Sequence, residues 1–336
     1  MSAGAHRPVI RTSLPGVDML EVLLEGPRAR GAFLLRSLLD PPWNLRIEDE
    51  AALALVCVTR GDAWLVTDAG ELYALRAGDL AIVRGPDHYT VCDDPATPPN
   101  VVVGPGGHCT STADGSSLAE LWGRGVRTWG PGARGDTVLL TGTYEHAGET
   151  GRLLLAALPA VVVLRKEDWS STLPDLLALE ATVDAPGQRA VLDRLLDVLL
   201  ISALRAWFAG QADQAPGWYR AQADPVVGTV LALLHAAPEH AWTVTDLAAR
   251  AGTSRAALGR RFTELLGQPP IAYLTQRRLQ LTADLLVESD ATLPAIAGRV
   301  GYGSPFALSA AFKREFGRSP KDYRAHRGAP DAAVQG

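Results

Sequence analysis

Arginine and lysine side chains gather at two places near the C-terminal end of the chain. Arg255, Arg260 and Arg261 lie within one short stretch, and Lys313 and Arg314 follow more than 50 residues later. The arginine side chain can bind O6 and N7 of guanine with two hydrogen bonds, and both residue types bind phosphates. The chemistry that these residues indicate is recognition of double-stranded DNA.

The segment that must position these side chains contains one helical pattern twice. Six residues of the first copy recur 50 positions later with the same residue type, namely Ser254, Leu258, Phe262, Gly267, Pro270 and Tyr273. Each copy predicts a short helix, a turn at Gly252 or Gly301, and a second helix that Ser254 or Ser304 caps. These are the features of a helix-turn-helix, whose second helix enters the major groove. A long helix is predicted between the copies, over 271–288.

The second copy carries the more specific signature. Its residues are Ile296-Ala297, Val300-Gly301-Tyr302, Phe306, Phe312-Lys313-Arg314, Phe316-Gly317, Ser319-Pro320 and Tyr323-Arg324. Together with the first copy they resemble the DNA-binding region of the AraC/XylS family of transcription regulators, over residues 241–327. The resemblance implies that promoter DNA and RNA polymerase are partners, and that activation is favoured over repression.

The second helices and their N-cap residues supply thirteen candidate DNA-binding residues. They are Ser254, Arg255, Ala256, Gly259, Arg260 and Arg261 in the first copy, and Ser304, Phe306, Ala307, Ser309, Ala310, Lys313 and Arg314 in the second. We expect Arg255 and Arg260 to contact base edges. The resemblance implies that Phe306, Ala307, Ser309 and Ala310 face the bases in the second copy. These side chains are small or apolar and suit thymine methyl groups. The alternative is that this helix mostly positions the protein through Lys313 and Arg314. An alternative for Arg261 and Arg314 is surface ion pairing with Glu264 and Glu315.

The charge of the chain is unevenly divided, as expected when one part of it meets phosphates. Residues 241–327 hold 13 Lys and Arg against 7 Asp and Glu, a net charge of +6, and the remainder holds 19 against 30. The 336 residues contain three cysteines, too few for a disulfide framework. No apolar run reaches the ~20 residues that cross a bilayer. We therefore expect a cytoplasmic protein without membrane contact.

From Gly31 the pattern changes to short strands, with turn residues every ~8–12 positions. Strands are expected at 32–39, 51–58, 63–67, 71–75, 80–83, 89–91, 101–103 and 137–144. This spacing predicts an antiparallel β-sandwich or small barrel. The segment 75–88 resembles the strand-turn-strand signature of cupins, as in sensor domains of AraC-type regulators, and the likeness covers 32–164. The predicted fold class is α+β, with a cupin-like sandwich plus helices and a C-terminal all-α domain.

Enzymatic cupins usually hold a metal with a His-x-His pair, a glutamate and a later histidine. Here Arg60-Gly-Asp-Ala-Trp64 stands at the equivalent turn, so we expect no metal, no cofactor and no catalytic residue. An alternative is that Cys92, His108 and Cys109 bind a soft metal or sense oxidation. Their spacing favours a structural role.

A cavity inside the sandwich would hold a small-molecule effector. The candidates for its lining are Trp43, Arg46, Trp64, His88 and Trp122. The tryptophans would supply apolar walls, and Arg46 and His88 would supply polar anchors. The competing interpretation places the tryptophans in the core and His88 in an ordinary turn.

Two helices are expected after the sandwich, at 173–182 and 188–209, and the segment 160–164 is expected to begin the transition to them. The wide apolar face of the second helix predicts either a homodimer interface or a helix buried within its own domain. The predicted domains are a cupin-like sensing and dimerisation domain (1–209, with a short helix at 18–25), a linker (210–225), a DNA-binding domain (226–327) and a disordered tail (328–336).

The whole sequence predicts a sequence-specific transcription regulator of the AraC type, an activator that responds to a small molecule. The competing prediction is a cupin-type enzyme or small-molecule-binding protein whose C-terminal helices only mediate assembly. The missing metal motif and the doubled helix-turn-helix pattern favour the regulator.

Overall fold

The computed structural model describes residues 33–124, 127–131, 134–145, 151, 154–169, 171–211 and 217–325. The chain divides into two compact units. We call the described residues from Phe33 to Gln211 the β-rich unit, and the described residues of Pro216–Thr282 and Asp290–Pro320 the helical unit. The predicted helix at 18–25 and the predicted tail at 328–336 lie outside the described residues. None of the helices in the described ranges is long and apolar enough to cross a membrane.

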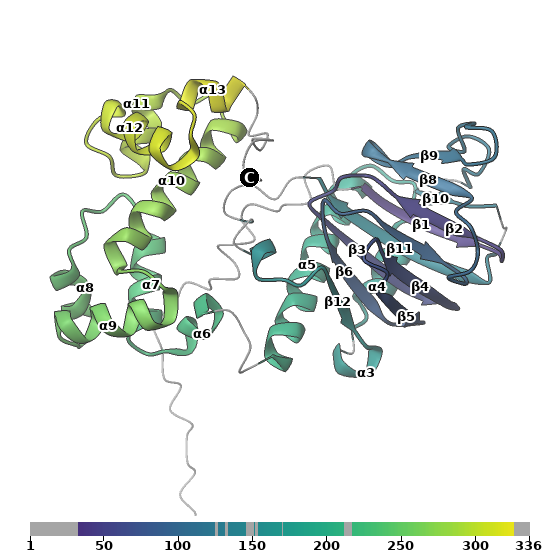
Figure 1. The fold of residues 1–336 in the computed structure, drawn as a ribbon, viewed down its shortest axis with the longest axis horizontal. Coiled ribbons are helices and arrows are strands. Elements are labelled where there is room, and N and C mark those ends of the chain that lie inside the picture. The colour runs from purple at the N-terminus through teal and green to yellow at the C-terminus, as the bar shows by residue number, and fades with distance from the viewer. Residues whose placement is uncertain are drawn as a thin grey trace, which may run out of the picture. The chain divides into compact units, whose positions relative to one another are not determined.

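The described part of the β-rich unit contains two six-stranded sheets (Figure 1). The strands of the first sheet are β1 (Phe33–Leu39), β3 (Leu53–Arg60), β6 (Leu80–Arg84), β10 (Thr128–Trp129), β11 (Thr137–Tyr144) and β12 (Val161–Leu164). Those of the second are β2 (Asn44–Ile47), β4 (Asp62–Thr67), β5 (Leu72–Arg76), β7 (Tyr89–Cys92), β8 (Val101–Gly104) and β9 (His108–Ser111). The strand orders are β10-β1-β11-β3-β6-β12 and β5-β4-β7-β2-β8-β9.

Apolar side chains from both sheets form the core of this unit. Val56 and Val58 of β3 and Leu139 of β11 belong to the same buried cluster as Leu45 of β2 and Val91 of β7. Full burial of one such side chain contributes ~1.5–3 kcal/mol. Because successive side chains of a strand point to opposite faces, the sequence of each strand decides which residues face its partner sheet.

The predicted α+β fold class and the eight expected strand regions are confirmed, but three details differ. The sequence did not predict β2, β9 or β10, and the expectation that 160–164 leads into a helix was wrong. Val161–Leu164 pairs antiparallel with β6, with Val161 opposite Val83 and Leu164 opposite Leu80. This partner lies far away in the sequence, so local pattern did not reveal it. The sandwich is also not wholly antiparallel, because β1 pairs with β10 and β2 with β8 in parallel.

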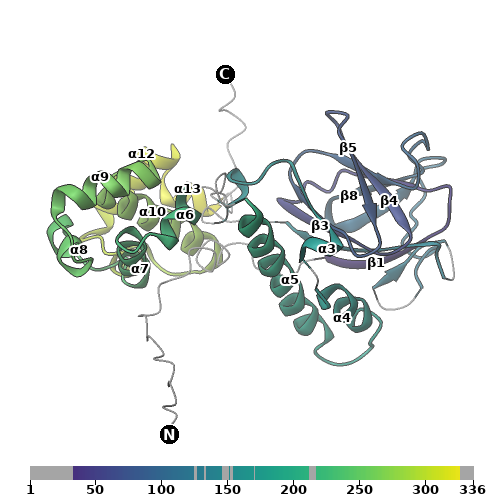
Figure 2. The same cartoon turned by 90° about the horizontal axis from the view of Figure 1, so that it is seen from below.

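Three helices follow the sheets, α3 (Lys166–Trp169), α4 (Leu173–Glu180) and α5 (Gln188–Gly210). Figure 2 shows α4 and α5 side by side next to the sheets. A Cβ at Gly142 of β11 would lie 2.5 Å from Cδ1 of Leu196, so the absence of a side chain there allows α5 to approach the strand closely. The hydroxyl of Tyr144 donates a hydrogen bond to Asp197 Oδ1 at 3.4 Å. Helix α5 therefore covers the outer face of the first sheet at β11.

The remaining described helices are α6 (Gly217–Ala223), α7 (Val227–Ala236), α8 (Val244–Arg250), α9 (Arg255–Leu266), α10 (Pro270–Glu288), α11 (Leu293–Arg299), α12 (Pro305–Phe316) and α13 (Pro320–Ala325). Helix α6 lies inside the segment that the sequence predicted to be a linker. A Cβ at Gly217 would lie 2.0 Å from the carbonyl oxygen of Leu265, so α6 packs directly on α9. That tertiary contact explains a helix in a segment with weak helical propensity.

Candidate nucleic-acid interface and internal cavity

The first helix-turn-helix consists of α8 and α9. Gly252 forms the turn with φ +65°, a conformation that side-chain-bearing residues rarely adopt. The hydroxyl oxygen of Ser254 accepts a hydrogen bond from the backbone N–H of Ala257 at 3.2 Å and so caps α9. Leu258 and Phe262 are fully buried on the inner side of the helix. The capped turn and the buried face together fix which side of α9 remains outside.

The second helix-turn-helix consists of α11 and α12 and repeats this construction. Gly301 forms the turn with φ +77°. The hydroxyl oxygen of Ser304 accepts a hydrogen bond from the N–H of Ala307 at 3.1 Å. Leu308 and Phe312 are fully buried. Both predicted motifs are therefore present, with the same cap and the same buried positions.

The candidate DNA-binding residues lie on or next to the outer faces of α9 and α12. Ten of them are exposed, namely Ser254, Arg255, Ala256, Arg260, Arg261, Phe306, Ala307, Ala310, Lys313 and Arg314. Three are half-buried, namely Gly259, Ser304 and Ser309. The structure thus leaves most of both predicted sets accessible to a partner from outside.

The three arginines of α9 differ in their contacts. Arg261 Nε forms an ion pair with Asp224 Oδ2 at 2.6 Å. Arg260 Nε lies 3.9 Å from Glu264 Oε1, and both side chains are exposed, so this pair contributes little to stability. The sequence suggested Glu264 as a partner of Arg261, but the structure pairs it with Arg260 instead. Arg261 therefore fixes α9 to the segment before α7, while Arg255 and Arg260 extend into solvent.

The outer face of α12 combines an apolar side chain with two cations. Phe306, in the first turn of the helix, is 85% exposed. Lys313 and Arg314 are exposed in the last turn, and neither forms an ion pair within the described residues. The alternative pairing of Arg314 with Glu315 is thus not seen there. A phenylalanine this exposed is unfavourable in water and suits contact with an apolar group of a partner.

The two motifs touch each other through the segment before α8. Arg278 of α10 donates hydrogen bonds from Nε to the carbonyl oxygen of Pro238 at 2.7 Å and from Nη2 to that of His240 at 2.8 Å. A Cβ at Gly301 would lie only 2.4 Å from the carbonyl oxygen of Glu239. The turn of the second motif therefore packs on the residues that lead into the first. Sequence reasoning missed Arg278, because its partners lie about 40 residues away and no local pattern marks them.

A second polar contact joins α7 to α10. His235 Nε2 lies 2.8 Å from the hydroxyl oxygen of Tyr273, and the Phe262 ring lies 5.7 Å from that of Tyr273 between centroids. Burial, with a smaller effect of the Arg277 charge, lowers the pKa of His235 to about 3. The imidazole is therefore neutral at physiological pH and belongs to the core of the helical unit.

The β-rich unit contains a cavity between its two sheets. It contains about 630 Å³ of space without atoms, a figure that includes solvent at its open mouth. Its apolar lining includes Leu35, Leu45, Ile47, Val103 and Trp129. Its polar lining consists of Ser37, Asp49, Tyr89, Thr141, Thr143 and Glu145. The predicted set of five lining residues contains none of them. The signal was the alternation Leu45, Ile47, Asp49, but the strand β2 that carries it was itself missed.

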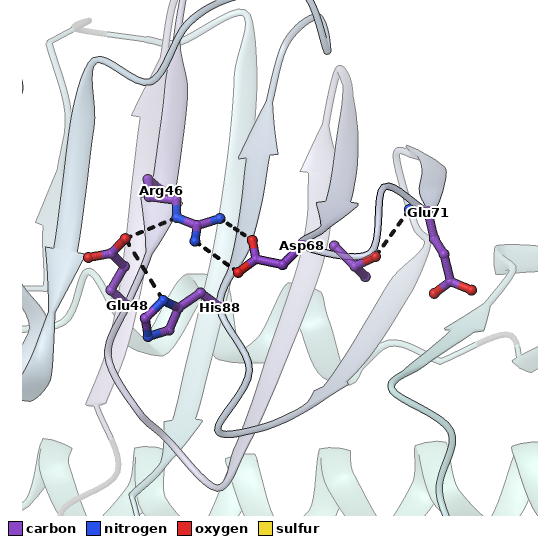
Figure 3. A network of polar contacts seen from close by, with 6 residues as sticks. Arg46, Glu48, Asp68, Glu71 and His88 are labelled. Carbon is purple, nitrogen blue, oxygen red and sulfur yellow. Dashed lines mark hydrogen bonds and ion pairs between the residues drawn. The ribbon is translucent and has the colours of Figure 1, made fainter.

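The five residues predicted to line an effector pocket are not among those that line this cavity. Arg46 lies between Leu45 and Ile47 on β2 and therefore points to the opposite face. There it binds Glu48 at 3.1 Å and Asp68 through both Nη atoms, and Glu48 lies 3.9 Å from His88 (Figure 3). The Arg46 and His88 side chains thus belong to a surface network.

Two of the three predicted tryptophans belong to the core cluster or pack against it. Trp43 is buried in the core cluster, and Trp122 packs against it as a partly buried residue. The rings of Trp122 and Trp129 are 4.8 Å apart between centroids, so Trp122 lies behind a residue that lines the cavity. Trp64 is half-buried on β4. The candidate site for a small molecule is therefore the cavity, not the predicted set of residues.

The cysteines are buried free thiols. Burial raises the pKa of Cys57 to about 12 and those of Cys92 and Cys109 to about 11. At neutral pH the thiols stay protonated, and a protonated thiol is a poor nucleophile and a poor metal ligand. Within the described ranges, no cluster of three or more His, Cys, Asp or Glu side chains could hold a metal ion.

Comparison with known proteins gives matches to both units. A family model described as a cupin matches residues 18–209, and one described as a helix-turn-helix domain matches residues 247–326. The chain is 34% identical over 318 residues to a putative AraC-like transcription regulator of Streptomyces antibioticus, covering 92% of this chain and 99% of that protein. It is 32% identical over 264 residues to the HTH-type transcriptional regulator AlkR of Acinetobacter baylyi, covering 72% and 86%.

Among solved structures, the helical region is similar to the DNA-binding domain of AdpA, described as a global transcriptional factor and solved in complex with a target DNA. The sequence identity is 40%, the TM-score is 0.29, and the match covers 31% of this chain and 92% of that one.

Proposed function

The chain belongs to the AraC-like family of transcription regulators, and from this premise we propose that α9 and α12 read the bases of an operator. The observation that carries the proposal is the pair of capped helices in one unit, each with an exposed outer face. The contact between Gly301 and Glu239 keeps the two motifs in a fixed relation. The two helices therefore bind a duplex as one body.

In the first reading helix, Arg255 and Arg260 contact base edges. Both are exposed, and Arg260 has only a weak surface ion pair to give up. An arginine that binds guanine through two hydrogen bonds contributes ~1–3 kcal/mol of discrimination. Arg261 keeps its short contact with Asp224 and orients the helix.

In the second reading helix, Phe306 and the small residues Ala307 and Ala310 contact the major groove. An exposed phenylalanine on a groove-facing helix suits the methyl group of thymine. Lys313 and Arg314 bind phosphates and position the helix. The first half-site would therefore be read mainly through hydrogen bonds and the second mainly through apolar contact.

The test is selection of duplexes from a randomised pool by the full-length protein at two salt concentrations. We expect enrichment of two base-pair clusters about one helical turn (~10 bp) apart, with affinity that falls steeply as salt rises. Arg255→Ala and Phe306→Ala should each relax the preference in a different cluster. Arg205→Ala, an exposed arginine of α5, is the matched control and should change nothing. A bound pool without sequence enrichment would refute the proposal.

We also propose that the cavity of the β-rich unit binds a small-molecule effector and that the protein acts in the cytoplasm as an activator, through RNA polymerase. The cupin match over residues 18–209 and the cavity between the sheets support the effector. The relatives are named as regulators, which supports binding of this ligand rather than its chemical conversion.

We further propose that the protein forms a homodimer through the exposed apolar residues of α4 and α5. Leu176 and Leu179 of α4 are 47% and 65% exposed, and Val191 and Val198 of α5 are each 45% exposed. Exposed apolar residues on neighbouring helices favour association.

Sedimentation velocity tests this surface. We expect Val198→Asp to reduce the mass from dimer to monomer. Leu72→Asp, which introduces the same charge at an exposed apolar residue of β5, should leave the dimer intact. A dimer that survives Val198→Asp combined with Leu179→Asp would contradict the assignment.

A further inference from the structure

The cavity between the sheets is apolar at one end and acidic at the other. On β2, Leu45 and Ile47 face the cavity, and Asp49, two residues after the end of the strand, also lines it. On β11, Thr143 faces the cavity, and Glu145 follows two residues later. Because β2 and β11 belong to different sheets, one carboxylate comes from each wall of the cavity.

The two carboxylates are close enough to affect each other, and the His88 charge acts on Asp49 less than the Glu145 charge does. Burial, with a smaller contribution from the Glu145 charge, raises the pKa of Asp49. Asp49 Oδ1 accepts a hydrogen bond from the N–H of Ala51 at 3.1 Å. Within the part of the chain that the structure describes, neither carboxylate forms an ion pair. A positive charge placed between them would be attracted by both.

The hydroxyl of Tyr89 is an independent sign of a ligand at the same end. Tyr89 is 4% exposed, lines the cavity and stands opposite Ile47 in the pairing of β7 with β2. Its hydroxyl oxygen has no hydrogen-bond partner among the described residues. Buried polar groups are almost always hydrogen-bonded. Since the Asp49 charge acts on this hydroxyl, the two groups lie near each other.

The other end of the cavity accepts hydrocarbon. Leu45 and Trp129 are buried there, and Leu35 and Val103 extend the same wall. These residues carry no charge. A hydrocarbon chain has no polar group that would lose a hydrogen bond to water when it enters this end of the cavity.

We propose that the cavity binds a primary organic amine with an apolar body, whose ammonium group lies between Asp49 and Glu145 and donates a hydrogen bond to Tyr89. This inference rests on the proposed effector function and names its ligand class. A carboxylic acid of the same size would be repelled by the two carboxylates. A quaternary ammonium has no N–H for the Tyr89 oxygen, and an alcohol lacks the charge.

The test uses octylamine, octanoate, octanol and octyltrimethylammonium, which share one hydrocarbon chain, and measures their binding to the full-length protein by isothermal titration calorimetry. We expect octylamine to bind at least tenfold more tightly than the other three at neutral pH, because only its head group satisfies all three polar side chains. Equal affinity for octylamine and octanol, tighter binding of octanoate, or no binding of octylamine would overturn the proposal.

Variants assign the effect to the named residues. Asp49→Asn keeps an oxygen for the Ala51 N–H and so preserves the loop, and Glu145→Gln changes an exposed side chain. Each should weaken octylamine roughly tenfold or more and leave octanol unchanged. Tyr89→Phe should weaken octylamine by a smaller factor. Asp62→Asn, at an exposed carboxylate of β4 away from the cavity, is the matched control.

Operator binding is measured separately on the same preparations without amine. Sequence-selective binding to DNA together with no preference for the amine would refute this inference and leave the proposed function standing. Variants that bind octylamine as tightly as the natural chain would likewise refute it.

Discussion

Because Gly301 packs against Glu239, we predict that a single methyl group added at Gly301 pushes the two DNA-binding motifs apart. Gly301→Ala places a Cβ 2.4 Å from the carbonyl oxygen and 2.7 Å from the Cα of Glu239. Gly252→Ala is a natural control, because Gly252 occupies the corresponding turn of the first motif with a similar φ and has no atom within 4 Å of the added Cβ. The two variants therefore share the backbone strain and differ in the clash.

The expected free energies follow from these two terms. An alanine in the left-handed region costs ~1–2 kcal/mol, of which up to ~1 kcal/mol is offset by the stiffer unfolded chain. Gly252→Ala should therefore reduce the free energy of unfolding by about 1 kcal/mol. In Gly301→Ala the Cβ and the Glu239 oxygen must also move apart by about 0.6 Å to reach 3.0 Å. Overpacking of this kind costs a further ~1–3 kcal/mol.

The consequence for DNA should be larger for Gly301→Ala as well. If the second motif shifts relative to the first, α12 loses register with its half-site while α9 keeps its own. Loss of one base contact costs ~1–3 kcal/mol, or roughly 5- to 150-fold in affinity. Binding to non-specific DNA should stay unchanged, since phosphate contacts dominate it.

Urea unfolding followed by circular dichroism and operator titrations of the full chain measure both effects. Equal destabilisation and equal operator affinity for Gly301→Ala and Gly252→Ala would show that the Glu239 contact does not constrain the motifs. The reasoning from the short Cβ distance at Gly301 would then be wrong.

Three further predictions concern the helical unit. Arg260→Ala should cost ~1–3 kcal/mol of discrimination at one base pair, and an unchanged preference across a randomised operator would remove Arg260 from the reading set. Lys313→Ala should weaken all duplexes about equally and lower the salt slope by about one, so a sequence-selective loss would contradict a phosphate contact. The folded-state pKa of His235 lies at about 3, below its value of 6.5 in the unfolded chain, so its stabilising effect is complete above pH 6.5 and is lost as pH falls from there towards 3. Acidification from pH 6.5 to 5 should remove ~1.6 kcal/mol of unfolding free energy, and an unchanged slope in His235→Gln would exclude this histidine as the cause.

The helical unit was the more predictable part, because its determinants are local. The turn, the helix cap and the buried side chain of the first motif are set by Gly252, Ser254 and Phe262, which lie within eleven positions. The same residue types recur at Gly301, Ser304 and Phe312, so the second copy supports the interpretation of the first. The ion pair of Arg261 with Asp224 could not be foreseen, because it depends on how α6 and α7 pack on α9.

The β-rich unit was predictable in its strand spacing and less so in its site. Turn residues mark where strands end, but the sheet order decides which strands face each other. Arg46 looked like a pocket anchor because it is charged and lies near tryptophans, whereas the pleat of β2 turns it outward and turns Leu45 and Ile47 inward. Without β2 in the prediction, neither its register nor the inward position of Asp49 could be derived.

One face of strand β11 borders the cavity, and its other face packs against helix α5. Thr141 and Thr143 border the cavity, while Gly142 between them touches Leu196 of α5 with no side chain to cushion the contact. A ligand that pushed this strand outward would therefore displace the helix behind it. That helix also carries Val191 and Val198, so in the proposed dimer an occupied cavity would shift residues of the subunit interface.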